Sequence, residues 1–204
     1  MSALHVASGF AGLALLASAV VCRLVCRLRL PWAARAAIAI TAGALVFVPA
    51  GDLLLVEYAR GVLGDLSITG QVLLVAYVAS YVSGRSLIDE RNINTVMFAI
   101  VGAALLLYPL ALGLTYFDPY ALGYRSAYFA TALLFGTLVA WYAGRYWLVV
   151  CVVLALACYT LRVLESDNVW DYLIDPLTAI YALGWTLNLF AVSIARRRRT
   201  PQPS

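Results

Sequence analysis

The sequence predicts an all-α integral membrane protein, a polytopic bundle of about seven transmembrane helices. Its composition is the first observation: 64% of the residues are hydrophobic and 12% are charged, whereas soluble domains are about half apolar and a quarter charged. The mean hydropathy is +0.91. Second, apolar runs of about 17–25 residues, the length a helix needs to cross the hydrocarbon of a bilayer, recur along the whole chain. Third, arginines and acids gather in different breaks between those runs.

The first apolar run covers residues 3–22. Ala17-Ser18-Ala19 resembles the cleavage site of a secretory signal, but such a signal carries its positive charge before the apolar run. Here the arginines follow the run, beginning at Arg23. We therefore predict that residues 3–22 are a retained first span that enters the membrane with its N-terminus outside.

Six further spans follow, each bounded by a charged or turn-rich break. The expected ranges are 36–51, 68–84, 95–114, 126–143, 146–164 and 176–195. The breaks are the arginine-rich segment 23–35, the long segment 52–67, and the segments RSLIDERN, TYFDPYALGYR, AGR and ESDNVWDYLIDP. Residues 1–195 are thus expected to form one seven-helix domain, and residues 196–204 a basic cytoplasmic tail.

Orientation follows from the arginines, because short loops rich in arginine stay in the cytoplasm. With seven spans and the C-terminus inside, eleven of the fourteen arginines are cytoplasmic. Eight of the ten acids then lie outside, leaving Asp89 and Glu90 inside. The outer arginines are Arg60, Arg125 and Arg162. The sequence therefore predicts a multi-pass protein of a bacterial inner membrane, with the N-terminus outside and the C-terminus inside.

The first outer segment, residues 52–67, is too long for a tight turn and has helical periodicity. Glu57, Arg60 and Asp65 fall on one face beside Gly61 and Gly64. We expect an interfacial helix in which Glu57 and Arg60, three positions apart, can pair. The polar face is expected to point toward protein, with the glycines admitting a neighbouring helix. The alternative is a solvated stripe on a connecting helix.

The other two outer segments, residues 116–125 and 165–176, combine acids with aromatic residues. Asp118 and Asp175 each precede a proline, and Asp175 is placed to cap the seventh span. Trp170 and Tyr172 fit the aromatic belt that forms at the head-group level of a membrane. An alternative reading gives these acids and rings a binding role.

Arg162 is expected about one turn before the outer end of the sixth span, with Glu165 as its nearest candidate partner. A cation at that depth can extend its side chain to the membrane surface or pair inside a polar cavity. The sequence leaves both readings open.

The acids suggest one site on the outer face. We hypothesise that Asp171 and Asp175 converge with Asp118 and Arg162 in a shallow pocket floored by Trp170 and Tyr172. The full set of candidate binding residues is Asp118, Arg162, Glu165, Trp170, Asp171, Tyr172 and Asp175, with Glu57, Arg60 and Asp65 from the first outer segment.

Several chemistries are excluded by the residue inventory. The chain has no lysine, so it cannot form a lysine Schiff base, and its one histidine, His5, cannot build a zinc site of several histidines. Its four cysteines lie in or beside predicted spans rather than in outer loops, which argues against a disulfide-exchange enzyme. The sequence predicts no cofactor, no metal site, no identifiable catalytic residue and no nucleic-acid partner.

Three functions remain open. The first is a non-catalytic envelope subunit that binds a partner protein, or a lipid or sugar head group, at the acidic and aromatic outer face. The second is a membrane-embedded enzyme that modifies envelope lipid or polysaccharide with outer-face carboxylates. The third is a transporter. The acids gather at one face rather than near the bilayer midplane, and this argues against proton-coupled transport.

Overall fold

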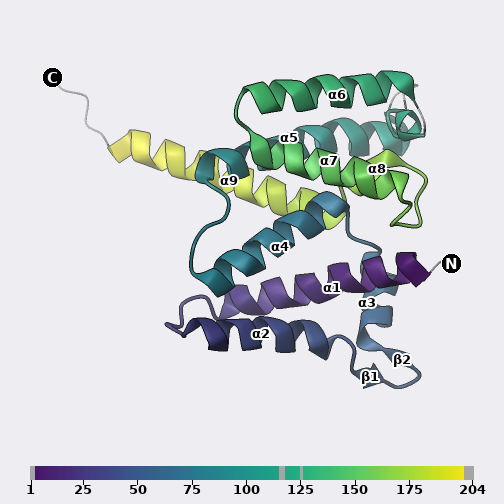
Figure 1. Cartoon of the computed structure of the whole chain (residues 1–204). Helices are drawn as coiled ribbons and strands as arrows, with labels where there is room; N and C mark the ends of the chain where they lie inside the picture. The colour runs from purple at the N-terminus through teal and green to yellow at the C-terminus, as the bar shows by residue number, and fades with distance from the viewer. Residues whose placement is uncertain (1–2, 115–117, 125, 200–204) are drawn as a thin grey trace.

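The computed structural model describes residues 3–114, 118–124 and 126–199. It is 77% helix and 2% strand, in agreement with the predicted all-α fold class. Seven longer helices lie side by side in a bundle (Figure 1). Each corresponds to one predicted span: α1 (Ala3–Leu24), α2 (Trp32–Leu45), α4 (Ile68–Ser83), α5 (Glu90–Pro109), α6 (Ala127–Tyr142), α7 (Tyr146–Thr160) and α9 (Pro176–Arg199).

Three of these helices are long and apolar enough to cross a membrane: the stretches Leu4–Leu24, Glu90–Leu112 and Pro176–Arg196. The other four apolar helices, α2, α4, α6 and α7, have 14 to 16 residues. At 1.5 Å per residue such helices are about 21–24 Å long, shorter than the roughly 30 Å of a hydrocarbon core. The chain is therefore a helical protein with three candidate membrane-spanning helices.

The second predicted span, 36–51, is shifted in the structure. Helix α2 ends at Leu45, and residues 49–54 form a small antiparallel hairpin of β1 (Pro49–Ala50) and β2 (Leu53–Leu54). Gly51 has a φ of +80°, a left-handed conformation that glycine adopts without a steric penalty. The hairpin leads into the short helix α3 (Leu55–Leu63), where the sequence predicts a helix within segment 52–67.

Helix α5 begins earlier than predicted because Asp89 caps it, with its carboxylate accepting a hydrogen bond of 3.2 Å from the amide of Asn92. At its other end the helix passes into a π-helical turn, η1 (Leu110–Leu114), just after Pro109. Proline has no amide hydrogen to donate to the helix. A 3₁₀ turn, η2 (Tyr120–Gly123), follows.

Helix α7 is also shorter than the predicted span 146–164. It ends at Thr160, and Arg162 has a φ of +51° in the turn that follows. Arg162 is thus exposed outside the helix rather than inside its last turn. A five-residue helix, α8 (Val169–Leu173), separates this turn from α9.

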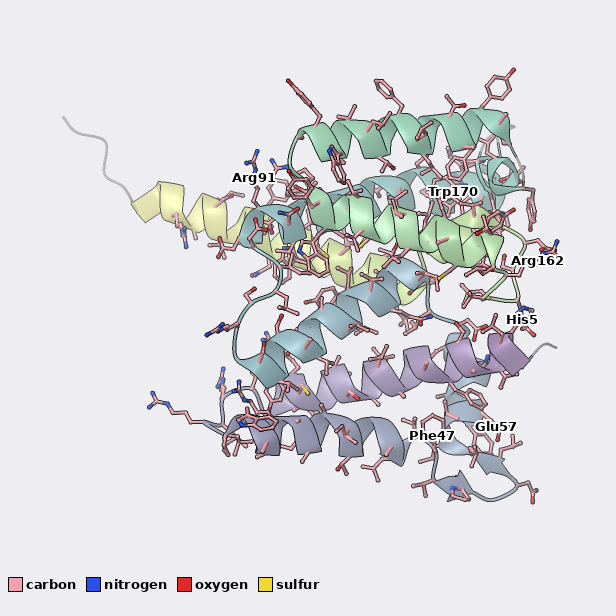
Figure 2. The ribbon with its side chains drawn as sticks, in the orientation of Figure 1. His5, Phe47, Glu57, Arg91, Arg162 and Trp170 are labelled. Atoms are coloured by element: carbon pink, nitrogen blue, oxygen red, sulfur yellow. The ribbon has the colours of Figure 1, made fainter. Side chains whose placement is uncertain are left out.

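The bundle has two chemically different ends. The acidic end carries the hairpin, α3, η2, α8 and the start of α9, and the arginine end carries the loops 25–31, 84–89 and 143–145 and the last turns of α9 (Figure 1). His5, Glu57 and Arg162 lie at the acidic end, and Arg91 lies at the other (Figure 2). The predicted separation of arginines from acids is therefore present in the fold.

Two buried apolar clusters join helices α4, α5, α7, α8 and α9. The larger one joins α5, α7, α8 and α9 through side chains that include Met97, Cys151, Trp170 and Ala182. The smaller one surrounds Tyr172, between α4, α7 and α8. Helix α8 contributes to both clusters, so the acidic loop that contains it is anchored in the interior.

Candidate functional site

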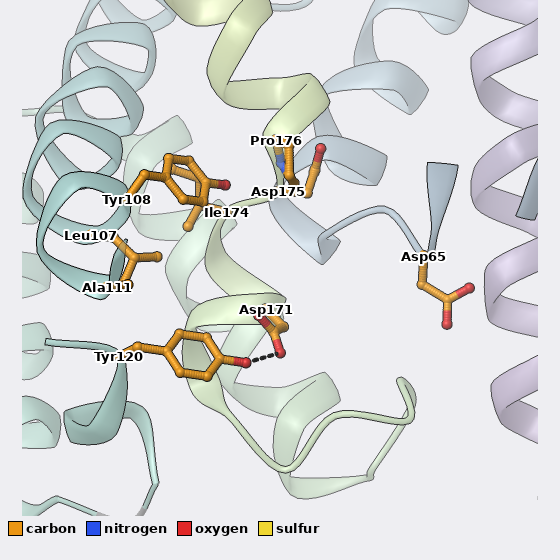
Figure 3. A pocket seen from close by; sticks show the side chains of 9 residues that line it. All are labelled: Asp65, Leu107, Tyr108, Ala111, Tyr120, Asp171, Ile174, Asp175 and Pro176. Carbon is orange, nitrogen blue, oxygen red and sulfur yellow. Dashed lines mark hydrogen bonds between the residues drawn. The ribbon is translucent and has the colours of Figure 1, made fainter. Parts of the chain in front are cut away.

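A pocket of about 380 Å³ opens at the acidic end (Figure 3). Its wall brings together segments that are far apart in the sequence: the turn after α3, the end of α5, the turns η1 and η2, and the α8–α9 junction. It is lined by Asp65, Leu107, Tyr108, Ala111, Tyr120, Asp171, Ile174, Asp175 and Pro176. Three carboxylates and two tyrosines thus surround an otherwise apolar hollow.

Asp175 forms the most heavily bonded part of this wall. It is only 6% exposed, and its carboxylate accepts hydrogen bonds from the amide and hydroxyl of Ser67 at 3.0 and 2.6 Å. It also accepts from the amide and hydroxyl of Thr178 at 2.8 and 2.7 Å. Asp175 therefore caps α9, as the sequence predicts, and also joins the starts of α4 and α9.

Ser67 completes this junction because it caps α4, its hydroxyl accepting from the amide of Gly70 at 3.1 Å. A β-carbon at Gly70 would lie 2.5 Å from the Thr178 hydroxyl and 2.9 Å from the Asp175 carboxylate. Only glycine lets the two helix starts approach this closely. Ser67, just before the apolar run at 68–84, fits the N-cap pattern, a signal that could have identified its role from the sequence.

Asp171 lies on α8 and faces the same pocket (Figure 3). The hydroxyls of Tyr120 and Ser166 donate to its Oδ2 atom, the former at 2.9 Å. Burial, and then the hydrogen bond to Asp171, raise the pKa of Tyr120 above its ordinary value, because both disfavour the phenolate. Tyr120 therefore remains a hydrogen-bond donor to the carboxylate at neutral pH.

Asp65 forms an ion pair with Arg60. Nε and Nη2 of Arg60 lie 2.6 and 2.8 Å from the two carboxylate oxygens, the two-point geometry that makes such pairs strong. The hydrogen bond to Asp65 raises the pKa of Arg60. Glu165 approaches Nη2 more weakly, at 3.4 Å. The first outer segment is thereby joined to the loop after α7.

The Arg60–Asp65 pair lies directly over Gly9 of α1. A β-carbon at Gly9 would overlap the Asp65 carboxylate and lie 2.8 Å from Nε of Arg60. No atom lies within 4 Å of the corresponding position at Gly61 or Gly64. The prediction that Gly61 and Gly64 admit a neighbouring helix is therefore wrong, and Gly9, which sequence reasoning missed, admits the ion pair instead.

The Arg60 pair gives a first test of these contacts. We expect Asp65→Ala to lower the free energy of unfolding by about 2 kcal/mol, because it leaves a largely covered guanidinium without its partner. Glu165→Ala should change it by less than about 0.5 kcal/mol, since that contact is long and half exposed. Unfolding in mixed detergent and SDS micelles measures both values. Equal losses in the two variants would contradict this account.

The floor of the pocket does not include Trp170 or Tyr172. Together with Asn168, these residues instead hold the loop around α8 in its conformation. Nδ2 of the Asn168 side chain donates to the Tyr120 carbonyl at 2.9 Å, and Nε1 of Trp170 donates to the Pro119 carbonyl at 2.9 Å. The Tyr172 hydroxyl accepts from the amide of Leu164 at 3.1 Å and donates to its carbonyl at 3.0 Å. All three side chains are buried, so they fix η2 and α8 in place.

The structure therefore assembles part of the predicted set. It gathers Asp65, Asp171 and Asp175 in one pocket but leaves Asp118 and Arg162 outside its lining. Asp118 is exposed, and its carboxylate accepts from the amide of Tyr120 in its own turn, at 2.9 Å. Tyr116 and Arg125, at the ends of that segment, lie outside the described residues.

Two candidate pairings from the sequence are not formed. Glu165 contacts Arg60 rather than Arg162, because α7 ends before Arg162 and the i,i+3 geometry is lost. Glu57 does not pair with Arg60: its carboxylate accepts from the amide of Leu54 at 2.7 Å, at the start of its own helix. Within the predicted polar stripe, Arg60 and Asp65 face protein. Glu57 instead accepts a hydrogen bond at the N-terminus of α3.

Tyr108 and Tyr120 are not among the candidate binding residues that the sequence suggested. Both line the pocket, and Tyr108 projects into it from α5 (Figure 3). Tyrosines near helix ends are common in membrane proteins, so their positions alone did not distinguish them from other interfacial aromatics.

The fold and the pocket define a class: an α-helical bundle with three candidate membrane-spanning helices and, at one end, a pocket whose lining includes three carboxylates. Among the described residues, no group of three or more histidine, cysteine, aspartate or glutamate side chains is arranged to hold a metal ion. No family model, no curated protein and no solved structure matches the chain.

Proposed function

We propose that the protein is a multi-pass, non-catalytic subunit of a bacterial inner membrane that binds a lipid or sugar head group, or a partner, at its acidic end. The observation that supports this most is the pocket itself. It joins carboxylates from the turn after α3, from α8 and from the α8–α9 junction. Its lining also includes Tyr108 and Tyr120. Ligand sites typically combine aromatic rings with a few precisely positioned polar groups.

The topology belongs to the same proposal: seven spans, the N-terminus and acidic end outside, and the C-terminus and arginine end in the cytoplasm. The seven longer helices run between the two ends of the bundle (Figure 1). Eleven of fourteen arginines fall at the arginine end, which the positive-inside rule assigns to the cytoplasm.

Reporter fusions test this topology. We expect fusions after Arg145 and after Arg199 to report a cytoplasmic location, because arginine-rich ends resist translocation. A fusion within residues 166–172 should report an external location. A cytoplasmic result for the 166–172 fusion would contradict both the seven-span count and an outer binding pocket.

Binding is better supported than the enzymatic alternative. Acid–base catalysis by a pair of carboxylates needs both members free to exchange protons with a substrate. Asp175 already accepts four hydrogen bonds, and Asp65 is paired with Arg60 through both oxygens. Asp171 retains one oxygen, Oδ1, that accepts no hydrogen bond from the described residues. This arrangement favours ligand binding over catalysis, with Oδ1 of Asp171 as the atom that would contact the ligand.

The binding role has a direct test. Asp171→Asn should lower the amount of lipid or partner that stays bound to the purified protein by at least about fivefold, since it removes the charge at the open oxygen. Asp118→Asn, a change of the same kind outside the pocket, should retain the wild-type amount. Native mass spectrometry of the detergent-purified proteins measures the bound mass. Identical spectra for all three proteins would refute the proposal.

A further inference from the structure

A second cavity lies in the bundle, next to the first. Its volume is about 250 Å³, and its wall is formed by α5, α6 and α7 with parts of α4 and α8. Helices α5 and α6 both pack against α7, and the cavity is lined from all three. The lining is almost entirely apolar, including Val96, Ile100, Ala103, Leu133, Leu148 and Val152.

The two cavities adjoin each other. Ile174 lines both of them. Along α5, Ala103 lines the apolar cavity and Leu107, one helical turn further on, lines the acidic pocket. A pocket lined by carboxylates at the end of the bundle thus shares a wall residue with an apolar cavity between the helices.

The acidic pocket has an excess of negative charge. Arg60 compensates Asp65, but the donors to Asp171 and Asp175 are neutral hydroxyls and amides in the part of the chain that the structure describes. A cation from outside would complement these two carboxylates. The rings of Tyr108 and Tyr120 line the same space, and aromatic faces attract ammonium groups.

We propose that the ligand of this site is an amphiphile with an amine-bearing head group in the acidic pocket and a hydrocarbon chain in the apolar cavity. This proposal rests on the proposed binding function and specifies its ligand. Asp171 receives the ammonium group through its open Oδ1 atom. Ile174, between the chambers, contacts the region where the head group meets the chain.

Gly136 gives a sharp test of the hydrocarbon chamber. It lines the apolar cavity, and a β-carbon there would meet no atom within 4 Å. Gly136→Leu is therefore expected to add bulk to the cavity wall at a position where the first added carbon meets no protein atom. Gly102→Leu is the matched control, because Gly102 is also an exposed helical glycine with no atom within 4 Å and does not line the cavity. Ala132→Leu is a second filling variant from the same wall.

The probes are three lipids with identical acyl chains, offered to the purified protein in detergent and scored by native mass spectrometry. They are phosphatidylethanolamine, phosphatidylglycerol and a monoglucosyl diacylglycerol. We expect wild type and Gly102→Leu to retain the ethanolamine lipid at least about fivefold over the other two. Gly136→Leu and Ala132→Leu should each lower that retention about tenfold, and Asp171→Asn should abolish the preference between lipids.

The outcomes separate this inference from the function on which it rests. If the filling variants match Gly102→Leu while Asp171→Asn still loses binding, the chain does not occupy the apolar cavity, and head-group binding stands. Equal retention of the ethanolamine and glycerol lipids, or a preference for the glucosyl lipid, would overturn the amine assignment. If no variant differs from wild type, the proposed function fails as well. Size-exclusion profiles of all the variants verify that each is folded.

Discussion

Asp175→Ala is expected to lower the free energy of unfolding by about 3 kcal/mol, more than any other single change at the acidic end. The substitution removes a helix cap, which alone is worth about 1 kcal/mol. Beyond the cap bond to the Thr178 amide, it leaves the amide of Ser67 without its acceptor in a site that is only 6% exposed, and a buried unsatisfied group costs about 1–3 kcal/mol. The loss should therefore exceed that of a simple cap.

Two further variants define what the carboxylate does. Asp175→Asn keeps an oxygen for the three donors at Oδ2 but places an amide nitrogen opposite the amide of Thr178. We expect it to cost about 1 kcal/mol, an intermediate value. Asp118→Ala, which removes an exposed contact within one turn, should cost less than about 0.5 kcal/mol. Unfolding in mixed micelles measures all three, and an Asp175→Ala loss no larger than that of Asp118→Ala would contradict the junction.

Gly9→Ala is expected to destabilise the protein by about 2 kcal/mol, in the direction opposite to helix propensity. Within a helix, alanine is favoured over glycine by about 1 kcal/mol. At Gly9, however, the added methyl group would overlap the Asp65 carboxylate and crowd Nε of Arg60. Overpacking of this kind costs about 1–3 kcal/mol, and it displaces a two-point ion pair.

The matched control is Gly102→Ala on α5, where the methyl group meets no atom within 4 Å. Its stability should be unchanged or slightly raised, as propensity predicts. The double variant Gly9→Ala with Asp65→Ala should lose less than the sum of the two single losses, because the contact that Gly9→Ala disturbs is already absent. If Gly9→Ala and Gly102→Ala have the same sign, the ion pair does not lie against α1 as described.

Much of the fold could be predicted from residue type and order. The seven longer helices lie where apolar runs occur, because burial of apolar side chains and internal backbone hydrogen bonding favour helices there. The ends of those helices were less predictable. Arg162 follows the last turn of α7, and α2 gives way to a hairpin near Gly51, since local turn geometry rather than hydropathy sets the boundary.

The candidate site was predictable only in part. Asp175 as a cap could be predicted from the proline that follows it, a local pattern. Its hydrogen bonds to Ser67, 108 positions earlier, could not be predicted, because no local sequence pattern relates residues so far apart. Likewise the partner of Glu165 is Arg60, 105 positions away, and not the nearer Arg162.

By itself, then, the sequence determined the all-α apolar class, the positions of the helices and the gathering of acids and arginines into separate breaks. These are properties of composition and of local order, which act through hydrophobicity and charge within one segment. The tertiary structure decided which acids share a pocket, which glycine admits the ion pair, and that an apolar cavity adjoins the acidic one. Those features depend on side chains from distant segments meeting in three dimensions, and helix packing sets their distances only when the whole bundle has formed.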